Sequence, residues 1–327
     1  MRRWGLTIPL TGMSLSDHEP VAAAAVAAGY TDLWTSEVNG VDAFTPLVLA
    51  AGWQPSARLG TAIVPVFTRG PALLAMSATA LPEVAPGRAV IGIGASSPAI
   101  VDQWNGLDFT DPFGRTRDTL RFLRKALAGE VVDEEFPSFR IRRFKLDRPP
   151  EQPPKLHLAA LRPGMLRLAA AEADGAILNW LAAGDVPKVT AERAGAPDGF
   201  DVAARIFVCP TTDAGYARAA GKRMITAYLT VGAYAEFHRW LGREAELGPV
   251  WDAWSAGDRK GALAAVPDDL VDALVLHGSP AQVRAKLHEY VEGGVRTPVI
   301  ALVPAPGTDL PAAVTALGPD AEVDSWS

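Results

Sequence analysis

Eight short apolar runs, separated by stretches with helical patterning, are the feature that most limits what this chain of 327 residues can fold into. Strands that alternate with helices form a parallel sheet, because each parallel neighbour needs a crossover connection. Eight such units are enough to close a barrel, and we predict a single (β/α)8 TIM barrel. In that fold the chemistry collects in the loops after the carboxyl ends of the strands. The runs cover residues 4–10, 31–36, 59–66, 89–95, 155–160, 175–179, 205–210 and 298–303.

Two long segments interrupt the alternation and predict insertions within one domain that spans residues 1–327. The first, approximately 105–154, follows the fourth strand, and its proline-rich second half predicts an insertion over the barrel mouth or rim. The second, approximately 222–267, follows the seventh strand and is mostly helical in pattern. Excursions of this length either cover a pocket or form a subunit interface, and the sequence leaves both interpretations open.

The composition argues against several classes of protein. With 31 basic and 37 acidic residues the net charge is −6, so neither nucleic acid nor an anionic membrane is an expected partner. Cys209 is the single cysteine, which excludes internal disulfides and suits a reducing cytoplasm. The five histidines are scattered without the spacing of metal ligands, and no apolar stretch is long enough for a membrane helix. We therefore expect a soluble cytoplasmic protein without a metal site.

The loop after the fourth strand has features of an anion site. Gly92 and Gly94 allow the backbone to approach a ligand closely, and a helix start at Pro98 follows Ala95 and Ser96. A helix N-terminus presents free N–H groups and a partial positive charge. The full dinucleotide-binding fingerprint is missing, so a tight turn from strand to helix explains the pattern equally well.

The loop after the fifth strand gives the stronger signal. Arg162 supplies a fixed cation, Pro163 suits the first position of a helix, and Gly164 leaves the backbone accessible. Donors, a helix dipole and a guanidinium group are the parts of a phosphate cradle. The alternative is an ordinary turn with a solvated arginine. The predicted cradle consists of Ala160, Leu161, Arg162, Pro163, Gly164 and Met165.

Side chains at two other strand ends are candidates for the reaction itself. Glu37 follows the second strand, where a carboxylate can act as an acid or a base, although an exposed loop acid is the simpler interpretation. Asn179 and Trp180 close the sixth strand and could form the wall of a pocket, with Trp180 stacking on a flat cofactor. Packing of Trp180 over the barrel rim is the alternative.

One basic run, residues 140–145 with Arg148 beyond it, lies in the first insertion. A solvated surface is the simpler interpretation of this run, and a binding strip for the acidic tail of a cofactor is the other. The motifs of serine hydrolases and of phosphate-binding P-loops do not occur in the sequence.

Five stretches, in order along nearly the whole chain, carry a family resemblance. They are GYTDLWTSE at 29–37, LGTAIVPVFTRGP at 59–71, RAVIGIGAS at 88–96, LAALRPGMLRLAAAEADGAILNW at 158–180, and the helix at 278–294. Together they resemble the bacterial luciferase-like monooxygenase family. Within that family the chain is most similar to the branch that uses 8-hydroxy-5-deazaflavin (coenzyme F420).

The resemblance implies a coenzyme that lies across the barrel mouth, with its phosphate at the loop after the fifth strand. It also implies a non-prolyl cis peptide between Ala62 and Ile63, which supports the coenzyme ring in similar proteins. In similar proteins, the sugar-phosphate and alcohol dehydrogenase members have His after strand two and Glu after strand four, where this chain has Glu37 and Ala95. The residues expected at the coenzyme are Trp34, Ala62, Ile63, Val64, Gly92, Gly94, Ala95, Ser96, Ala160, Leu161, Arg162, Pro163, Gly164, Met165, Asn179 and Trp180.

We therefore predict an oxidoreductase that transfers hydride between the deazaflavin coenzyme and a small, mainly apolar substrate, with Glu37 as proton donor or acceptor. One alternative is a monooxygenase that depends on flavin mononucleotide (FMN), and another is a (deaza)flavin-binding protein without catalysis. The residues alone would also permit a phosphate-binding barrel such as an aldolase, although no lysine stands at the end of a predicted strand to form a Schiff base. We expect a homodimer.

Overall fold

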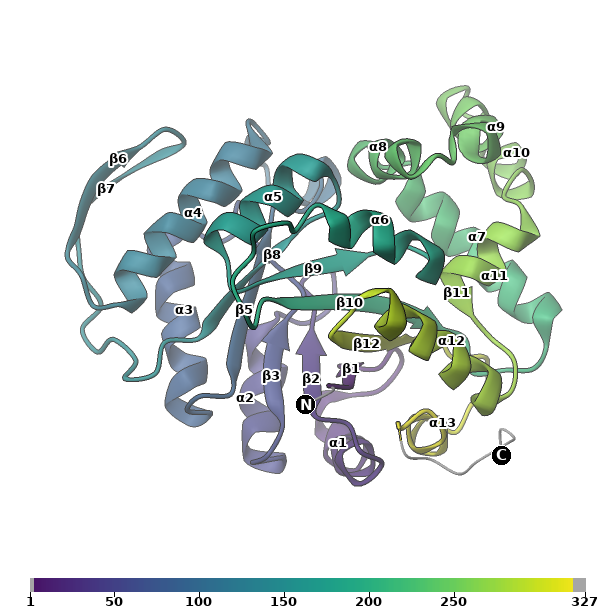
Figure 1. Cartoon of the computed structure of the whole chain (residues 1–327), viewed down its shortest axis with the longest axis horizontal. Helices are drawn as coiled ribbons and strands as arrows, with labels where there is room; N and C mark the ends of the chain where they lie inside the picture. Colours follow the sequence, from purple (N-terminus) through teal and green to yellow (C-terminus); the bar gives the residue numbers. More distant parts are fainter. Residues whose placement is uncertain (1–2, 320–327) are drawn as a thin grey trace.

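Eight parallel strands close into a ring in the structure, a computed structural model that describes residues 3–319 (Figure 1). The ring closes where β12 pairs with β1, with Gly5 opposite Val299. Each ring strand overlaps one of the eight predicted runs, so the predicted TIM barrel is confirmed. In ring order the strands are β1 (Gly5–Thr7), β2 (Asp32–Thr35), β3 (Arg58–Thr61), β5 (Ala89–Gly94), β8 (Lys155–Ala159), β9 (Gly175–Asn179), β10 (Asp201–Val208) and β12 (Thr297–Leu302).

Helices cover the outside of this ring (Figure 1), and side chains cap several of them. At the start of α12 the side chains of Ser279 and Gln282 each bond the other residue's backbone N–H. At the start of α4 the carboxylate of Asp111 accepts a 3.0 Å hydrogen bond from the N–H of Gly114. The covering helices are α1 (His18–Ala27), α2 (Phe44–Trp53), α3 (Pro71–Val84), α4 (Pro112–Leu127), α5 (Pro163–Glu172), α6 (Val186–Ala191), α12 (Pro280–Gly293) and α13 (Leu310–Ala316), with short turns η1 (Leu15–Asp17), η2 (Ala99–Trp104) and η3 (Ala183–Asp185).

The first predicted insertion contains α4 and an antiparallel hairpin of β6 (Val132–Phe136) and β7 (Phe139–Phe144). The ring of Phe122 on α4 contacts the rings of Phe136, Phe139 and Phe144, which fixes the hairpin along this helix. Figure 1 shows the hairpin at the outer edge of the molecule, beyond α4. The hairpin therefore lies on the flank of the barrel and not over its mouth.

The basic run in this hairpin has acidic partners of its own. Arg142 forms a 3.3 Å ion pair with Asp133 on the neighbouring strand, and Arg148 forms a 3.3 Å ion pair with Glu83 on α3. The arginine side chains are more than half exposed. This arrangement matches the simpler interpretation of the run as a solvated surface.

The second insertion is a group of helices that packs on the carboxyl ends of β9 and β10. Trp180 and Phe207, which come from those strand ends, are part of the same hydrophobic cluster as the buried side chains of these helices. Figure 1 shows the helices together at one end of the molecule. The segment comprises α7 (Ala214–Leu229), α8 (Gly232–Leu241), α9 (Glu244–Ser255), α10 (Arg259–Ala264) and α11 (Asp268–Leu274), followed by β11 (Val275–Leu276), which pairs with the end of β10.

The indole of Trp34 fills the middle of the barrel and is completely buried. Gly5 and Gly60 face it from the neighbouring strands. A Cβ atom on Gly60 would lie 2.4 Å from the ring atom Cε3, and one on Gly5 would lie 3.0 Å from Cδ1. Glycine at these two positions therefore makes room for the largest side chain inside an eight-stranded barrel.

A charged cluster closes the barrel at the amino ends of its strands. The guanidinium of Arg58 bonds the carboxylate of Asp32, Oδ2 of Asp201 at 2.8 Å and the hydroxyl of Thr297 at 3.0 Å. Because Asp201 is paired inside the barrel, β10 begins there, four residues before the predicted run 205–210. The prediction was wrong about this boundary because a charged residue at the start of a strand has the sequence signature of a loop.

Candidate active site at the mouth of the barrel

The end of the third strand brings Ala62 and Ile63 to the barrel mouth. Pairing with β5 resumes only at β4 (Val64–Pro65), so the intervening residues bulge out of the ladder. The peptide bond between Ala62 and Ile63 is cis, as the family resemblance implies. Both side chains are partly exposed and pack on the interior cluster that contains Trp34. They form one part of the floor of the mouth.

Gly92 and Gly94 keep the adjoining part of this floor flat. The hydroxyl of Thr61 accepts a 2.8 Å hydrogen bond from the N–H of Gly92 and donates one of 2.9 Å to its carbonyl oxygen. A Cβ atom on Gly92 would lie 2.1 Å from the carbonyl oxygen of Thr61, and one on Gly94 would lie 2.8 Å from the Cβ of Ala159. The two glycines therefore permit β5 to approach both neighbouring strands.

The loop after β8 has the open geometry of an anion site. α5 begins at Pro163, and among the described residues no side chain caps its first turn. The backbone N–H groups of Gly164 and Met165 lie in this first turn, where no intrahelical acceptor is available. The side chain of Arg162 is exposed and has no ion pair or hydrogen bond within residues 3–319, while its carbonyl oxygen accepts a 3.0 Å hydrogen bond from the N–H of Leu166. Of the other predicted residues nearby, Ala160 is buried, and Ala95, Ser96 and Leu161 are partly exposed.

Glu37 is held in place by an arginine that the sequence analysis did not single out. Its Oε2 accepts hydrogen bonds from Nη2 of Arg69 at 2.8 Å and from the N–H of Ala43 at 3.0 Å, and its Oε1 accepts one from Nε of Arg69 at 3.2 Å. The backbone N–H of Glu37 donates to the carbonyl oxygen of Ile63 at 3.2 Å. The carboxylate thus belongs to the edge of the floor and is fixed on both oxygens.

The two tryptophans expected at the coenzyme are buried. Trp34 lies inside the barrel, and Trp180 is 1% exposed, with its ring 4.2 Å from that of Phe207 and 5.1 Å from that of Tyr228 (centroid distances). The left-handed backbone of Trp180, with φ of 55°, follows directly after Asn179, the last residue of β9. The structure therefore corrects both expectations: Trp34 fills the core, and Trp180 packs under the second insertion.

Asn179 does reach the mouth, where it meets residues of β10 and of the second insertion. Its Nδ2 lies 2.9 Å from the hydroxyl of Tyr234, while Oδ1 is buried without a partner in the described part of the chain. Arg205 stands opposite Asn179 in the ladder between β9 and β10, and its guanidinium lies 4.8 Å from the centre of the Phe207 ring. Burial raises the pKa of Tyr234 to about 12. Sequence reasoning missed Arg205, whose only signal was a cation at the start of an apolar run.

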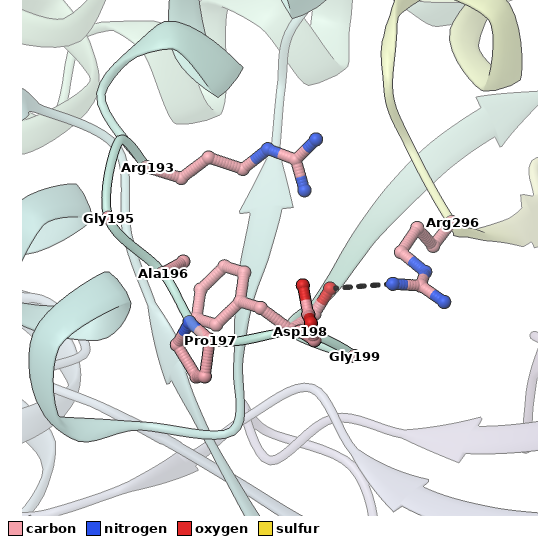
Figure 2. A pocket seen from close by; sticks show the side chains of 8 residues that line it. Arg193, Gly195, Ala196, Pro197, Asp198, Gly199 and Arg296 are labelled. Carbon is pink, nitrogen blue, oxygen red and sulfur yellow. Dashed lines mark hydrogen bonds between the residues drawn. The ribbon is translucent and has the colours of Figure 1, made fainter.

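A separate hollow of about 250 Å³, whose lining residues are shown in Figure 2, lies at the amino ends of β10 and β12, opposite the mouth of the barrel. Its lining comes from the loop that precedes β10 and from Arg296, which donates a 3.4 Å hydrogen bond to the carbonyl oxygen of Phe200. Active sites of TIM barrels lie at the carboxyl ends of the strands, so this hollow is not the candidate site. Within residues 3–319 no cluster of three or more His, Cys, Asp or Glu residues is suited to hold a metal ion, and no helix is both long and apolar enough to cross a membrane.

Comparison with known families agrees with this geometry. A model of the family described as luciferase-like monooxygenase matches residues 4–297. This chain belongs to the luciferase-like monooxygenase family. The match spans seven of the ring strands and reaches the start of the eighth, β12, so it includes the loops that form the candidate site.

Two of the three similar proteins described next carry coenzyme F420 in their names. A Mycobacterium tuberculosis protein provisionally named as a coenzyme F420-dependent oxidoreductase is 28% identical, over 91% of this chain and 92% of its own length. The 5,10-methylenetetrahydromethanopterin reductase of Methanolobus tindarius is 28% identical over 84% of this chain and 86% of its own length. The solved structure of the coenzyme F420-dependent tetrahydromethanopterin reductase of Methanopyrus kandleri shares the fold, with a TM-score of 0.77, 23% identity and 98% coverage of each chain.

Proposed function

We propose that this protein is an oxidoreductase that transfers hydride between the deazaflavin coenzyme F420 and a small organic substrate. The observation that carries the proposal is the uncapped start of α5 beside the glycine floor of β5, on neighbouring strands of the ring. The start of α5 provides N–H donors for a phosphate, and the glycine floor of β5 provides a flat surface for a ring system. The names of the Mycobacterium tuberculosis relative and of the Methanopyrus kandleri reductase support the same coenzyme.

The residues present fit such a coenzyme. Arg162 and the N–H groups of Gly164 and Met165 would hold its phosphate, while Ala62 and Ile63 would contact its ring, together with Gly92 and Gly94. When bound, the deazaflavin supplies or accepts the hydride, and the protein contributes orientation and exclusion of water.

Glu37 is the residue we propose for proton transfer. It lies at the edge of the floor, bonded through its backbone to Ile63, and its side chain is 18% exposed. Arg69 fixes the direction of the carboxylate by bonding both of its oxygens, and a carboxylate in this position can accept a proton. Substrate oxidation, in which a hydroxyl loses a proton as its carbon loses hydride, is the direction that such an acceptor assists.

A parallel fluorescence titration with coenzyme F420 and with FMN tests the proposal. We expect saturable binding of coenzyme F420 with a micromolar or lower dissociation constant and weaker binding of FMN. Preference for FMN would favour the monooxygenase alternative. The fold of an FMN-bound 3,6-diketocamphane monooxygenase component from Pseudomonas putida, with a TM-score of 0.64 and 17% identity, is compatible with that alternative. Saturable binding of neither would refute the proposal.

We further propose a homodimer in the cytoplasm. Large apolar side chains on the outer faces of α2 and α3 are exposed, and a second copy of the chain would cover them. The single cysteine, Cys209, is buried and free, which suits a reducing compartment. Native mass spectrometry of the purified protein measures the number of subunits directly. The exposed residues are Val48, Leu49, Leu73 and Met76.

A further inference from the structure

Arg205 is a cation at the barrel mouth without an acidic partner in the described part of the chain. Its Nε is buried and makes no hydrogen bond there, and the residue keeps part of its surface accessible. Arg58, the other arginine inside the barrel, is bonded to two carboxylates, those of Asp32 and Asp201. The two arginines therefore differ in kind: one is neutralised by the fold, and the other is not.

A cation without an acidic partner at this depth destabilises the folded chain. Taking a charged group out of water is unfavourable unless an opposite charge and hydrogen bonds replace the lost solvation. Burial lowers the pKa of Arg205. The polar neighbours of its guanidinium are the hydroxyl group of Tyr228, to which the side chain is hydrogen-bonded, and that of Tyr234, and neither neighbour is a carboxylate. A ligand anion is what would complete this site.

The surroundings of Arg205 indicate which anion fits. A single cation with neutral donors around it matches one negative charge, whereas a phosphate dianion is usually bound by more. The planar guanidinium matches the two oxygens of a carboxylate. Asn179 offers one unpartnered amide atom beside Tyr234, and Phe207 supplies an apolar surface under the guanidinium. As placed, Nδ2 donates to the hydroxyl of Tyr234 and the unpartnered atom is the acceptor Oδ1. Donation from Asn179 to the anion requires the reversed amide, in which Tyr234 donates to Oδ1 and Nδ2 is free.

We propose that Arg205, Asn179 and Tyr234 form a carboxylate subsite that anchors the substrate. The substrate class is then a carboxylic acid with an apolar body. This inference rests on the proposed function, and it adds an anchoring point to the mainly apolar substrate that the sequence suggested. β10 and β8 are separated by β9 in the ring, so the subsite is distinct from the predicted phosphate cradle at the start of α5.

Calorimetric titration of the apoprotein with small acids and their neutral amides tests the subsite. The probes are acetate, propanoate and benzoate, each paired with acetamide, propanamide or benzamide. We expect the wild type to bind at least one acid about tenfold or more tightly than its amide, because hydrogen bonds to a charged group are the strong ones. Arg205→Met should abolish this preference, and Arg205→Lys should retain part of it.

Arg193→Met is the matched control, because Arg193 lines the hollow at the opposite end of the barrel (Figure 2) and its removal should leave the preference unchanged. Arg205→Met should fold, since no carboxylate within residues 3–319 loses a partner, and its melting temperature should equal or exceed that of the wild type. A lower melting temperature would show that Arg205 is a structural residue and would count against the subsite.

Three results would overturn the proposal: no preference for any acid in the wild type, the same preference in Arg205→Met, or displacement of the bound acid by coenzyme F420. The last would assign the subsite to an acidic group of the coenzyme. These results are distinguishable from failure of the proposed function, because that function fails when the wild type binds neither coenzyme F420 nor FMN. Arg205→Met should bind coenzyme F420 as tightly as the wild type does.

Discussion

The carboxylate of Glu37 and the guanidinium of Arg69 form a two-bonded ion pair at the edge of the barrel mouth, with distances of 2.8 Å and 3.2 Å. The pair connects the loop after β2 to the loop after β4, and the N–H of Ala43 adds a third bond from the start of α2. Both side chains are less than one-fifth exposed. The pair therefore has two separable properties, a charge beside the proposed coenzyme site and a structural connection between loops.

Glu37→Gln should reduce turnover at least tenfold and leave the affinity for coenzyme F420 nearly unchanged. Glutamine keeps the size of the side chain but cannot accept the proton, while the phosphate cradle lies on a different strand. Steady-state kinetics and the coenzyme titration measure the two quantities. Turnover equal to that of the wild type would remove Glu37 from the mechanism.

Arg69→Met is the control for the structural part of this pair. We expect the free energy of unfolding to fall by about 1–3 kcal/mol, because a mostly buried carboxylate loses two charged hydrogen bonds. The double variant with Glu37→Gln should be less destabilised than the sum of the single variants, since they remove the same bonds. Urea unfolding of the three variants measures this coupling, and strict additivity would contradict the pairing.

The stability of the protein should fall as the pH is lowered below about 6.5. Burial lowers the pKa of His157 to about 4, and that of His238 to about 3, from the ordinary value of 6.5. Between the folded and unfolded pKa values only the unfolded chain binds the proton, so acid favours unfolding. Each histidine contributes a loss of about 1.4 kcal/mol per pH unit in this window, or about 2 kcal/mol between pH 6.5 and 5.

His157→Gln isolates one of these contributions. Urea unfolding at pH 7, 6 and 5 should show that the variant loses about 2 kcal/mol less than the wild type across that interval. The folded pKa of His157, about 4, lies below this interval, so the folded protein keeps the ring mostly neutral and nearly the whole effect should be present at pH 5. Equal pH dependence in the two proteins would mean that His157 titrates normally in the folded state.

Gly60→Ala should destabilise the protein by about 1–3 kcal/mol, because the new methyl group would overlap the ring of Trp34 in a packed core. Gly52→Ala is the matched control. Gly52 is exposed on α2 and has no atom within 4 Å of the position of a Cβ, so alanine there should be neutral or stabilising. Thermal unfolding measures the melting temperatures of both variants. Similar melting temperatures would show that the barrel interior can accommodate the extra methyl group without loss of stability.

The alternation of apolar runs and helical stretches predicted the barrel well. Each parallel strand appears in the sequence as an apolar run between turn residues, and the number of runs gives the number of strands in the ring. What it could not predict is which side chains face each other once the ring closes. The family resemblance implied that Trp34 and Trp180 contact the coenzyme, with packing over the rim as the alternative for Trp180. In the structure Trp34 lies inside the barrel, and Trp180 packs under the second insertion. Burial of a large ring depends on the small residues opposite it, such as Gly60, and these are distant in sequence.

The residues missed at the candidate site share one property. The roles of Arg69 and Arg205 depend on residues of other elements. Arg69 bonds Glu37, and Arg205 lies near Asn179 and Tyr234. Arg69 lies just after one predicted apolar run and Arg205 begins another, and neither position by itself indicates a functional role. The loop of Arg162, in contrast, carries its cation, proline and glycine in consecutive positions, and local sequence was enough to predict an anion site there.

Arg162→Met should weaken the binding of coenzyme F420 about tenfold or more, because a guanidinium bonded to a phosphate contributes charged hydrogen bonds that methionine cannot replace. Arg167→Met on the same helix is the matched control. Arg167 is 63% exposed and bonded to Glu192 at 2.7 Å, well along α5 from the cradle, so its loss should alter neither stability nor coenzyme affinity measurably. Raising the salt concentration should weaken coenzyme binding to the wild type more than to Arg162→Met. Equal affinities of the two variants would place the coenzyme phosphate elsewhere on the barrel mouth.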